Sequence, residues 1–492
     1  MPSIKEITAM CRSGQIQEAY ELARLDMQHQ CPWAQHAMGW VLYYLIKSDA
    51  ESANYPSLIT HLDELNALDQ LSIPEDNMIF ENVLFKVAGY VKAHVSPTSD
   101  DSSDKLSKLF SKLQGYNFDS SRGYSFLLQS FIKCSGWDKM ADFLDWWNLN
   151  KLKEEDYTPY QLENGKTIMS VAERAFIAKS KALLRLNDLG RIEEFLPQMD
   201  NLMDNHPEMT YPGYFYGKML LTLGSTQEDA LRVILPFARK KATEFWVWQL
   251  MSDIFTNDQE KQLACLLRAV NCRTQEKFLG KVRIKLANLY IQRNQLDCAK
   301  YHIDKVTQCY LPQGWHLPFE IDCWIHQPWI NTVVPNANAP IDYIAITNGI
   351  LCAGTEEAVA IVTFVDQNSR KATLVYGHEK RTSQKLRFKV TPGAVLKINY
   401  ITEADGDIRV LCTGLTRFQT DLNYAKVIEG TVRKRSDKDF AFLKTIDGDF
   451  YIPPILVRKH ELHDNETIKC LIVWDFNRKK ETWNWKCVCI KK

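Results

Sequence analysis

The spacing of hydrophobic residues along the chain changes near residue 312. From residue 1 to about 312, apolar residues recur at the spacing of amphipathic helices, and polar turns separate short segments. In residues 175–207 this pattern predicts a helix ending near Leu186, a tight turn through Asn187 to Gly190, and a second helix running towards His206. Pro207 ends the second helix, because proline lacks the backbone donor and clashes with the preceding turn.

A repeated interval organises this helical region. Each predicted second helix carries a packing residue a few positions after a polar turn, and the four are Phe195, Ala230, Ala264 and Ala299. The intervals between them are 35, 34 and 35 residues, which resembles the tetratricopeptide repeat. The first-helix Trp–Leu–Gly–Tyr set of that family is mostly missing. The alternative is a non-repetitive helical domain in which the spacing coincides by chance.

A proline-rich stretch follows the helical region and precedes a β-rich one. Five prolines between residues 312 and 340 break helices at short intervals, and residues 338–351 favour one last short helix. After residue 356, apolar and polar residues alternate in short segments separated by turns, which is typical of strands. The predicted fold is therefore multidomain, α then β: a tetratricopeptide-like α-helical solenoid over 1–312, a connector or capping segment over 313–356, and then one or two small antiparallel β-barrels. The first, divergent barrel would span 357–418 and the second 424–492.

The second barrel contains the most specific motif. Residues 430–453, GTVRKRSDKDFAFLKTIDGDFYIP, resemble the first half of a cold-shock domain, a five-stranded oligonucleotide-binding (OB) barrel. The family's motif Lys-Gly-Phe-Gly-Phe corresponds to residues 438–442, and its motif Val-Phe-Val-His corresponds to residues 450–453, with Pro453 in place of the histidine. The first barrel resembles a divergent copy with Tyr376 and Phe388 on its surface.

This resemblance implies a set of nucleic-acid-binding residues. Phe440, Phe442 and Tyr451 would stack on unpaired bases, and nearby cations would attract phosphates. Lys434 and Arg435 replace an exposed aromatic pair of the family. The cationic members of the set are Arg433, Lys434, Arg435 and Lys438. Arg433 and Arg435 are expected to share one face of the preceding strand, with Lys434 on the other.

The direction of the rings is open at the level of sequence. Phe440 and Phe442 are two residues apart, so they share one face of the predicted strand. If that face meets solvent, each stacked base is worth roughly 1–3 kcal/mol. If instead it lines the barrel, Ala441 and Leu443 lie outside and the phenylalanines are only core.

Charge and cysteine usage support this interpretation without deciding it. The chain carries 60 Lys and Arg against 60 Asp and Glu, but from Ile341 onward there are 25 against 19. A basic tail indicates a polyanionic partner. The 13 cysteines are odd in number and irregularly spaced, as expected in a reducing cytosol. We find neither a signal-peptide pattern nor an apolar run long enough to span a membrane, so a cytoplasmic location and no membrane partner are expected.

Motifs of catalysis are missing from the sequence. It has no phosphate-loop lysine motif, no Cys-x-x-Cys pair and no Gly-x-Ser-x-Gly. His460 and His463 lack the spacing that places two metal ligands on one helical face. We therefore expect a protein that is not an enzyme and needs no cofactor or metal. Hydrolase activity is a third hypothesis, and it predicts a deep polar pocket in which carboxylates or histidines converge.

The sequence as a whole predicts a non-catalytic adaptor. The helical array would bind a protein or peptide partner, and the tail would bind single-stranded RNA or DNA. Helical repeats with a cold-shock-like tail resemble accessory proteins of bacterial conflict (antiphage) systems, which act beside a nuclease, helicase or primase. The alternative is a pure protein-interaction scaffold whose barrels serve assembly alone.

Overall fold

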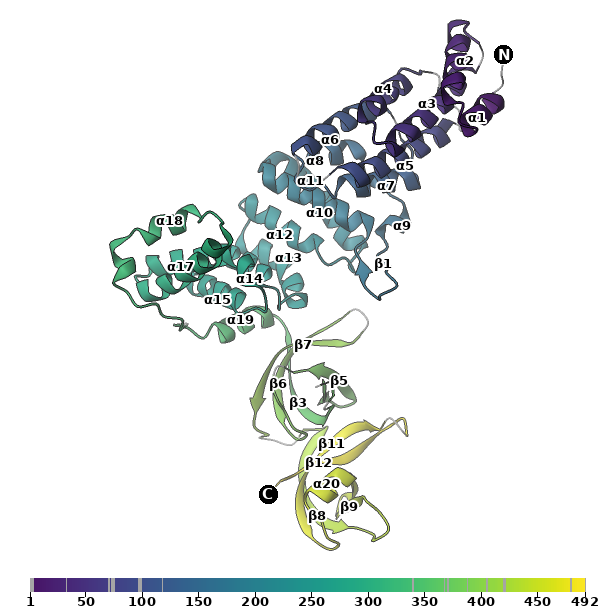
Figure 1. The fold of residues 1–492 in the computed structure, drawn as a ribbon. Helices are drawn as coiled ribbons and strands as arrows, with labels where there is room; N and C mark the ends of the chain where they lie inside the picture. Colours follow the sequence, from purple (N-terminus) through teal and green to yellow (C-terminus); the bar gives the residue numbers. More distant parts are fainter. Residues whose placement is uncertain are drawn as a thin grey trace. The chain divides into compact units, whose positions relative to one another are not determined.

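The computed structural model describes most of the chain, and it divides into two compact units, Met1–Lys240 and Lys241–Lys492. The described residues are 4–31, 33–69, 71, 76–95, 100–116, 118–338, 340–366, 368–369, 371–386, 388–403, 406–418, 422–477 and 480–491. Figure 1 shows mostly helices from the purple N-terminal end into the green, and mostly strands from there to the yellow C-terminal end. Among the described helices, none combines the length and the apolar character that crossing a bilayer requires.

The first unit consists of helices and one short hairpin. The hairpin pairs β1 (Tyr160–Gln161) with β2 (Thr167–Ile168). The helices are α1 (Ile4–Arg12), α2 (Ile16–Gln28), α3 (Ala34–Glu51), α4 (Tyr55–Asn66), α5 (Asn77–His94), α6 (Asp100–Leu113), α7 (Arg122–Phe131), α8 (Met140–Trp147), α9 (Glu154–Tyr157), α10 (Val171–Leu186), α11 (Leu189–Asn205), α12 (Pro212–Thr222) and α13 (Gln227–Lys240).

The second unit begins with helices and ends with strands. Its helices are α14 (Phe245–Ile254), α15 (Gln259–Val270), α16 (Gly280–Gln292), α17 (Leu296–Tyr310), α18 (Phe319–Ile325), α19 (Tyr343–Cys352) and α20 (Pro454–Lys459). Its strands are β3 (Glu356–Val365), β4 (Lys371–Gly377), β5 (Lys380–Lys385), β6 (Val395–Thr402), β7 (Ile408–Thr416), β8 (Ala425–Arg433), β9 (Ala441–Thr445), β10 (Gly448–Ile452), β11 (Thr467–Asn477) and β12 (Thr482–Lys491). The predicted order of helices followed by strands is confirmed, as is a short helix before the first strand.

Polar turns start the second helix of each predicted pair. α10 ends at Leu186, and α11 begins after Asp188, whose side chain accepts a hydrogen bond from the Arg191 N–H. Asp258 caps α15 in the same way through the Lys261 N–H. Such caps satisfy backbone donors that have no partner inside the helix. The four packing residues are all fully buried: Phe195, Ala230, Ala264 and Ala299. Membership in the tetratricopeptide family itself stays a prediction.

The first β module is an open sheet rather than the closed barrel that the sequence predicted. Its strand order is β5-β4-β3-β6-β7, and all neighbours are antiparallel. The sheet curls far enough for the Gln384 side chain on one edge strand to donate to the Ile408 carbonyl on the other, at 3.1 Å. Tyr376 and Phe388, predicted to lie on its surface, instead pack half-buried against the apolar cluster that includes Leu374. The alternation of apolar and polar residues predicted which segments form strands. It did not predict whether the two edge strands would pair and close the sheet into a barrel.

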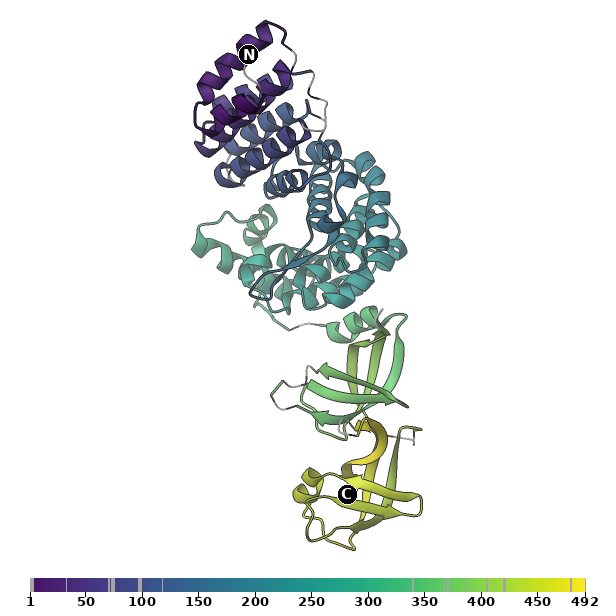
Figure 2. The same cartoon turned by 90° about the vertical axis from the view of Figure 1, so that its right-hand side faces the viewer.

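The second β module is a closed barrel of five strands. The strand order is β10-β12-β11-β8-β9, with β10 and β12 parallel and the other pairs antiparallel. Figure 2 shows its strands, in yellow, curled around the core. Val432, Leu443, Ile452, Ile472 and Cys487 fill that core, and none exposes any surface. Phe440, predicted to share a strand with Phe442, lies just before β9 rather than inside it.

A second apolar cluster joins the open sheet to the closed barrel. Ile361, Val375 and Val395 of the sheet pack with Leu471 and Val473 of the barrel, and all five are buried. In the same cluster, the Tyr424 hydroxyl donates to the Val359 carbonyl at 2.5 Å. Burying this surface stabilises the two β modules against each other.

We predict that close helix packing makes Gly217 intolerant of a side chain. A Cβ at Gly217 in α12 would overlap the Ile234 side chain of α13. Gly217→Ala is therefore expected to lower the free energy of unfolding by about 1–3 kcal/mol.

The matched control is Gly89→Ala in α5, where a Cβ meets nothing within 4 Å. Alanine there should stabilise by about 0.5–1 kcal/mol, since helical glycine costs that much in entropy. Calorimetric melting of the two variants measures the difference, and equal shifts of the melting temperature would contradict the packing argument.

Candidate nucleic-acid interface

The hairpin β9–β10 buries one face and exposes the other. Ala441 and Leu443 of β9 are 1% and 0% exposed, whereas Phe442 between them is 39% exposed. In β10, Phe450 and Ile452 are 6% and 0% exposed. Because successive side chains of a strand point to opposite faces, the buried residues direct the intervening ring outward. This geometry answers the question that the sequence left open: Ala441 and Leu443 lie inside.

Three aromatic rings gather on the outer face of the barrel, and we call them the aromatic trio: Phe440, Phe442 and Tyr451. Tyr451 is 37% exposed and Phe440 is half-buried. The ring centroids of Phe440 and Phe442 are 5.8 Å apart, those of Phe440 and Tyr451 are 5.6 Å apart, and those of Phe442 and Tyr451 are 6.0 Å apart. Partial burial raises the pKa of Tyr451, so its hydroxyl stays protonated at neutral pH. The trio is an uncharged, partly exposed aromatic surface of the kind on which bases stack.

Strand register places a cation at each end of this surface. Arg433 of β8 is paired with Phe442 of β9, Phe442 with Tyr451 of β10, and Tyr451 with Lys486 of β12. Paired residues on neighbouring strands share a face. The outer face therefore presents one row across four strands, in the order cation, aromatic, aromatic, cation.

The two cations nearest the end of β8 differ in their surroundings. Arg433 is exposed, and its guanidinium donates to the Asn465 side chain, which leaves its charge uncompensated by that contact. Lys434 lies beyond the strand end and donates from its ammonium to the Leu462 carbonyl, at 3.2 Å. The structure thus places Arg433 beside the trio and turns Lys434 toward the β10–β11 connection.

Arg435 and Lys438 are bound to a nearby carboxylate. Asp437 lies 3.1 Å from the Arg435 guanidinium and 3.8 Å from the Lys438 ammonium. These pairs are exposed, so salt and water screen them and a phosphate can compete for the cations. The strand that was expected to carry Arg435 ends at Arg433, so the predicted alternation of faces does not extend to it.

Lys486 was missed by sequence reasoning. Its ammonium lies 2.5 Å from Asp475, a carboxylate that is buried, and Arg381 of β5 lies 3.4 Å from the same carboxylate. Two cations on one carboxylate leave one positive charge in excess. No local motif marks Lys486, because the parallel pairing of β10 and β12 that brings it to Tyr451 joins positions distant in sequence.

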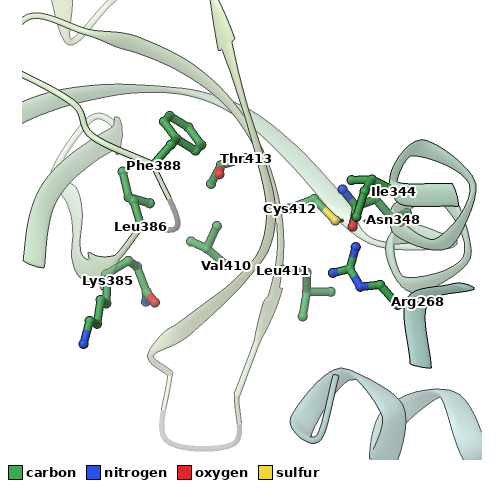
Figure 3. Close-up of a pocket in the computed structure, with 11 residues that line it drawn as sticks. Arg268, Ile344, Asn348, Lys385, Leu386, Phe388, Val410, Leu411, Cys412 and Thr413 are labelled. Atoms are coloured by element: carbon green, nitrogen blue, oxygen red, sulfur yellow. Dashed lines mark hydrogen bonds between the residues drawn. The ribbon is translucent and has the colours of Figure 1, made fainter. Parts of the chain in front are cut away.

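A hollow in the second unit was tested as a possible reaction site. It lies between the open sheet and helices α15 and α19, and Figure 3 shows its lining, which includes Arg268, Asn348, Lys385, Phe388 and Cys412. The described lining contains no carboxylate or histidine that could act as an acid or base. In the described part of the chain, no cluster of three or more His, Cys, Asp or Glu side chains is placed to hold a metal ion.

We predict that the two faces of β9 differ in their contribution to stability. Leu443→Ala opens a core cavity and should cost about 2–5 kcal/mol. Phe442→Ala removes only outer contacts with neighbouring rings and should cost about 1 kcal/mol. Hydrogen exchange of peptides from β8 to β12 in the full chain measures both values. Equal losses would contradict the assignment of inner and outer faces.

Two family models match parts of the chain. Residues 210–344 match a domain of unknown function, DUF7017, which spans α12 to the start of α19. Residues 426–490 match the S1/CSD-like domain 2 of the TOTE conflict systems, which spans nearly the whole closed barrel. No curated protein matches the chain. The C-terminal barrel, with the aromatic trio on its outer face, is thus similar to a cold-shock-like domain of conflict systems.

Proposed function

We propose that this chain is a non-catalytic adaptor of a conflict system that binds single-stranded nucleic acid on the outer face of its C-terminal barrel. In this proposal the helical region binds a protein partner. The observation that carries the proposal is the row of Arg433, Phe442, Tyr451 and Lys486 across four strands.

The chemistry of this row fits unpaired nucleotides. Bases have an apolar face that aromatic rings can cover, and phosphates are attracted by the cations at both ends. A duplex hides those faces within its stacks, so exposed rings favour single strands. Stacking on a ring is possible for every base, which favours binding with little sequence preference.

The match to a conflict-system domain supports the biological context. The matched model is named for the TOTE conflict systems and covers the barrel that bears the trio. A chain that holds single-stranded nucleic acid and also docks onto a protein would bring substrate to an enzyme of such a system. That role requires no catalytic residue in this chain.

Exposed apolar side chains support the protein-binding part of the proposal. Four large ones occur within residues 311–334: Leu311, Trp315, Phe319 and Val334 are 57%, 42%, 79% and 81% exposed. Large apolar side chains left in water are common at protein-binding surfaces. They also support the alternative function, a scaffold that binds proteins and no nucleic acid.

An oligonucleotide titration of the full chain tests the proposal. A fluorescent single strand of about six nucleotides lies within the site sizes of one OB barrel. Wild-type chain should bind it, and the affinity should fall as salt rises. Phe442→Ala/Tyr451→Ala should weaken binding at least about tenfold, because stacking on two rings is lost.

Ile446→Ala is the matched control in this titration. Ile446 lies in the turn between β9 and β10 and is 103% exposed, so it belongs to the same hairpin but not to the row. Its removal should leave affinity unchanged. If the wild-type chain does not bind the oligonucleotide at low salt, the scaffold function replaces the proposed one.

A further inference from the structure

We infer that the open sheet β3–β7 carries a second surface for single-stranded nucleic acid, which continues the row on the barrel. The surface, called the sheet-face patch, consists of Phe364, Lys371, Ser383 and Lys385. The inference rests on the proposed function, since it lengthens the path of the same strand. It goes beyond the barrel because residues 357–416 lie outside both matched family models.

Strand register places the patch on one face of the sheet. Phe364 of β3 is paired with Thr373 of β4, and Thr373 with Ser383 of β5. The side chains of Thr373 and Ser383 approach to 3.3 Å, which confirms that they share a face. Lys371 and Lys385 form the next pair on the same face, two residues further along both strands.

The patch is exposed and contains an aromatic ring among cations. Phe364 is 56% exposed, whereas Ile361 and Val362 of the same strand are fully buried. Lys371, Ser383 and Lys385 are also exposed. Figure 3 shows the ammonium of Lys385 directed away from the β7 side chains that line the hollow. A ring left in water beside lysines is the combination that the barrel presents in its own row.

Charge in this region favours a polyanion. Residues 380–402 contain six Lys and Arg and no Asp or Glu. Lys385 forms no ion pair within the described part of the chain. The acid on the β3–β4 turn is Asp366, which accepts hydrogen bonds from the Ser369 hydroxyl and the Asn368 N–H and whose charge also interacts with that of Lys371. Charge complementarity therefore favours single-stranded nucleic acid, which is anionic, as the ligand of the patch over a protein with a neutral surface.

Arg381 connects the patch to the barrel. It lies on the same face of β5 as Ser383 and Lys385, and its guanidinium shares the buried Asp475 carboxylate with Lys486. It also donates to the Phe476 carbonyl at 3.3 Å, which holds β5 against the end of β11. Lys486 is paired with Tyr451. The cations thus run from the aromatic trio across Asp475 onto β5.

The length of this path sets the size of its ligand. A strand rises about 3.3 Å per residue, so Lys385 lies about 13 Å beyond Arg381 along β5. Together with the row on the barrel, this distance makes a path that is longer than the shortest nucleic-acid segment bound by a single OB fold. A short oligonucleotide should therefore fit on the barrel alone, and a long one should reach both surfaces.

The test compares two oligonucleotide lengths on the full chain. Labelled single strands of about six and about twenty nucleotides are titrated with wild type and with Phe364→Ala/Lys385→Ala. The variant should bind the long strand about tenfold more weakly, and its salt dependence should be shallower by about 0.7 in log–log slope for the lost lysine. Its affinity for the short strand should equal that of wild type.

The matched control removes the same kinds of side chain elsewhere on the sheet. Leu415→Ala/Lys397→Ala deletes an exposed apolar residue of β7 and a lysine of β6, neither of which belongs to the sheet-face patch. It should leave binding of both strands unchanged. A second variant, Lys385→Glu alone, keeps the test valid if the double variant does not fold.

Three outcomes are distinguishable. A loss confined to the long strand in the patch variants supports the inference. Equal binding of the long strand by wild type and both patch variants overturns the inference and leaves the barrel function standing. Failure of wild type to bind either strand overturns the proposed function, and the inference falls with it.

Discussion

Burial of the inner residues of β9 and β10 is the constraint on which the interface depends. Ala441, Leu443 and Ile452 lose nearly all contact with water inside the closed barrel. Because successive side chains of a strand point to opposite faces, this burial places the side chains of Phe442 and Tyr451 on the outer face of the barrel. Apolar rings kept in water lower solubility and gain nothing for the core. Their partial exposure on a well-packed barrel is the feature on which the proposed nucleic-acid binding rests.

Closure of the barrel and one buried carboxylate extend this surface beyond the hairpin. The parallel pairing of β10 with β12 brings Lys486 beside Tyr451. Asp475, which is 2% exposed, then holds both Lys486 and Arg381. A buried carboxylate without cations would be costly, so these contacts stabilise the junction of the two β modules as well as positioning charge. The same ion pairs that join sheet and barrel thus align the cations of the proposed path.

The alternation expected from the sequence agrees with the structure along β9 but fails at the end of β8. The alternation around Phe442 is a property of adjacent residues, and it survives folding. Arg433 and Arg435, in contrast, do not share a strand face as expected. β8 ends at Arg433, and Arg435 forms an ion pair with Asp437. Where a strand stops depends on how much of its partner is available for pairing. Residues 434–440 have no such partner and form a turn.

The sequence alone determined the order of helices and strands, the positions of the turns within each helix pair, and which residues supply the aromatic trio. These follow from spacing between neighbouring residues, which the backbone geometry of helices and strands imposes directly. Only the tertiary structure decided that the first sheet stays open, that Leu443 rather than Phe442 enters the core, and that Lys486 and Arg381 meet at Asp475. Those outcomes depend on pairing between strands far apart in the chain, and no local pattern encodes which distant strand will become the neighbour.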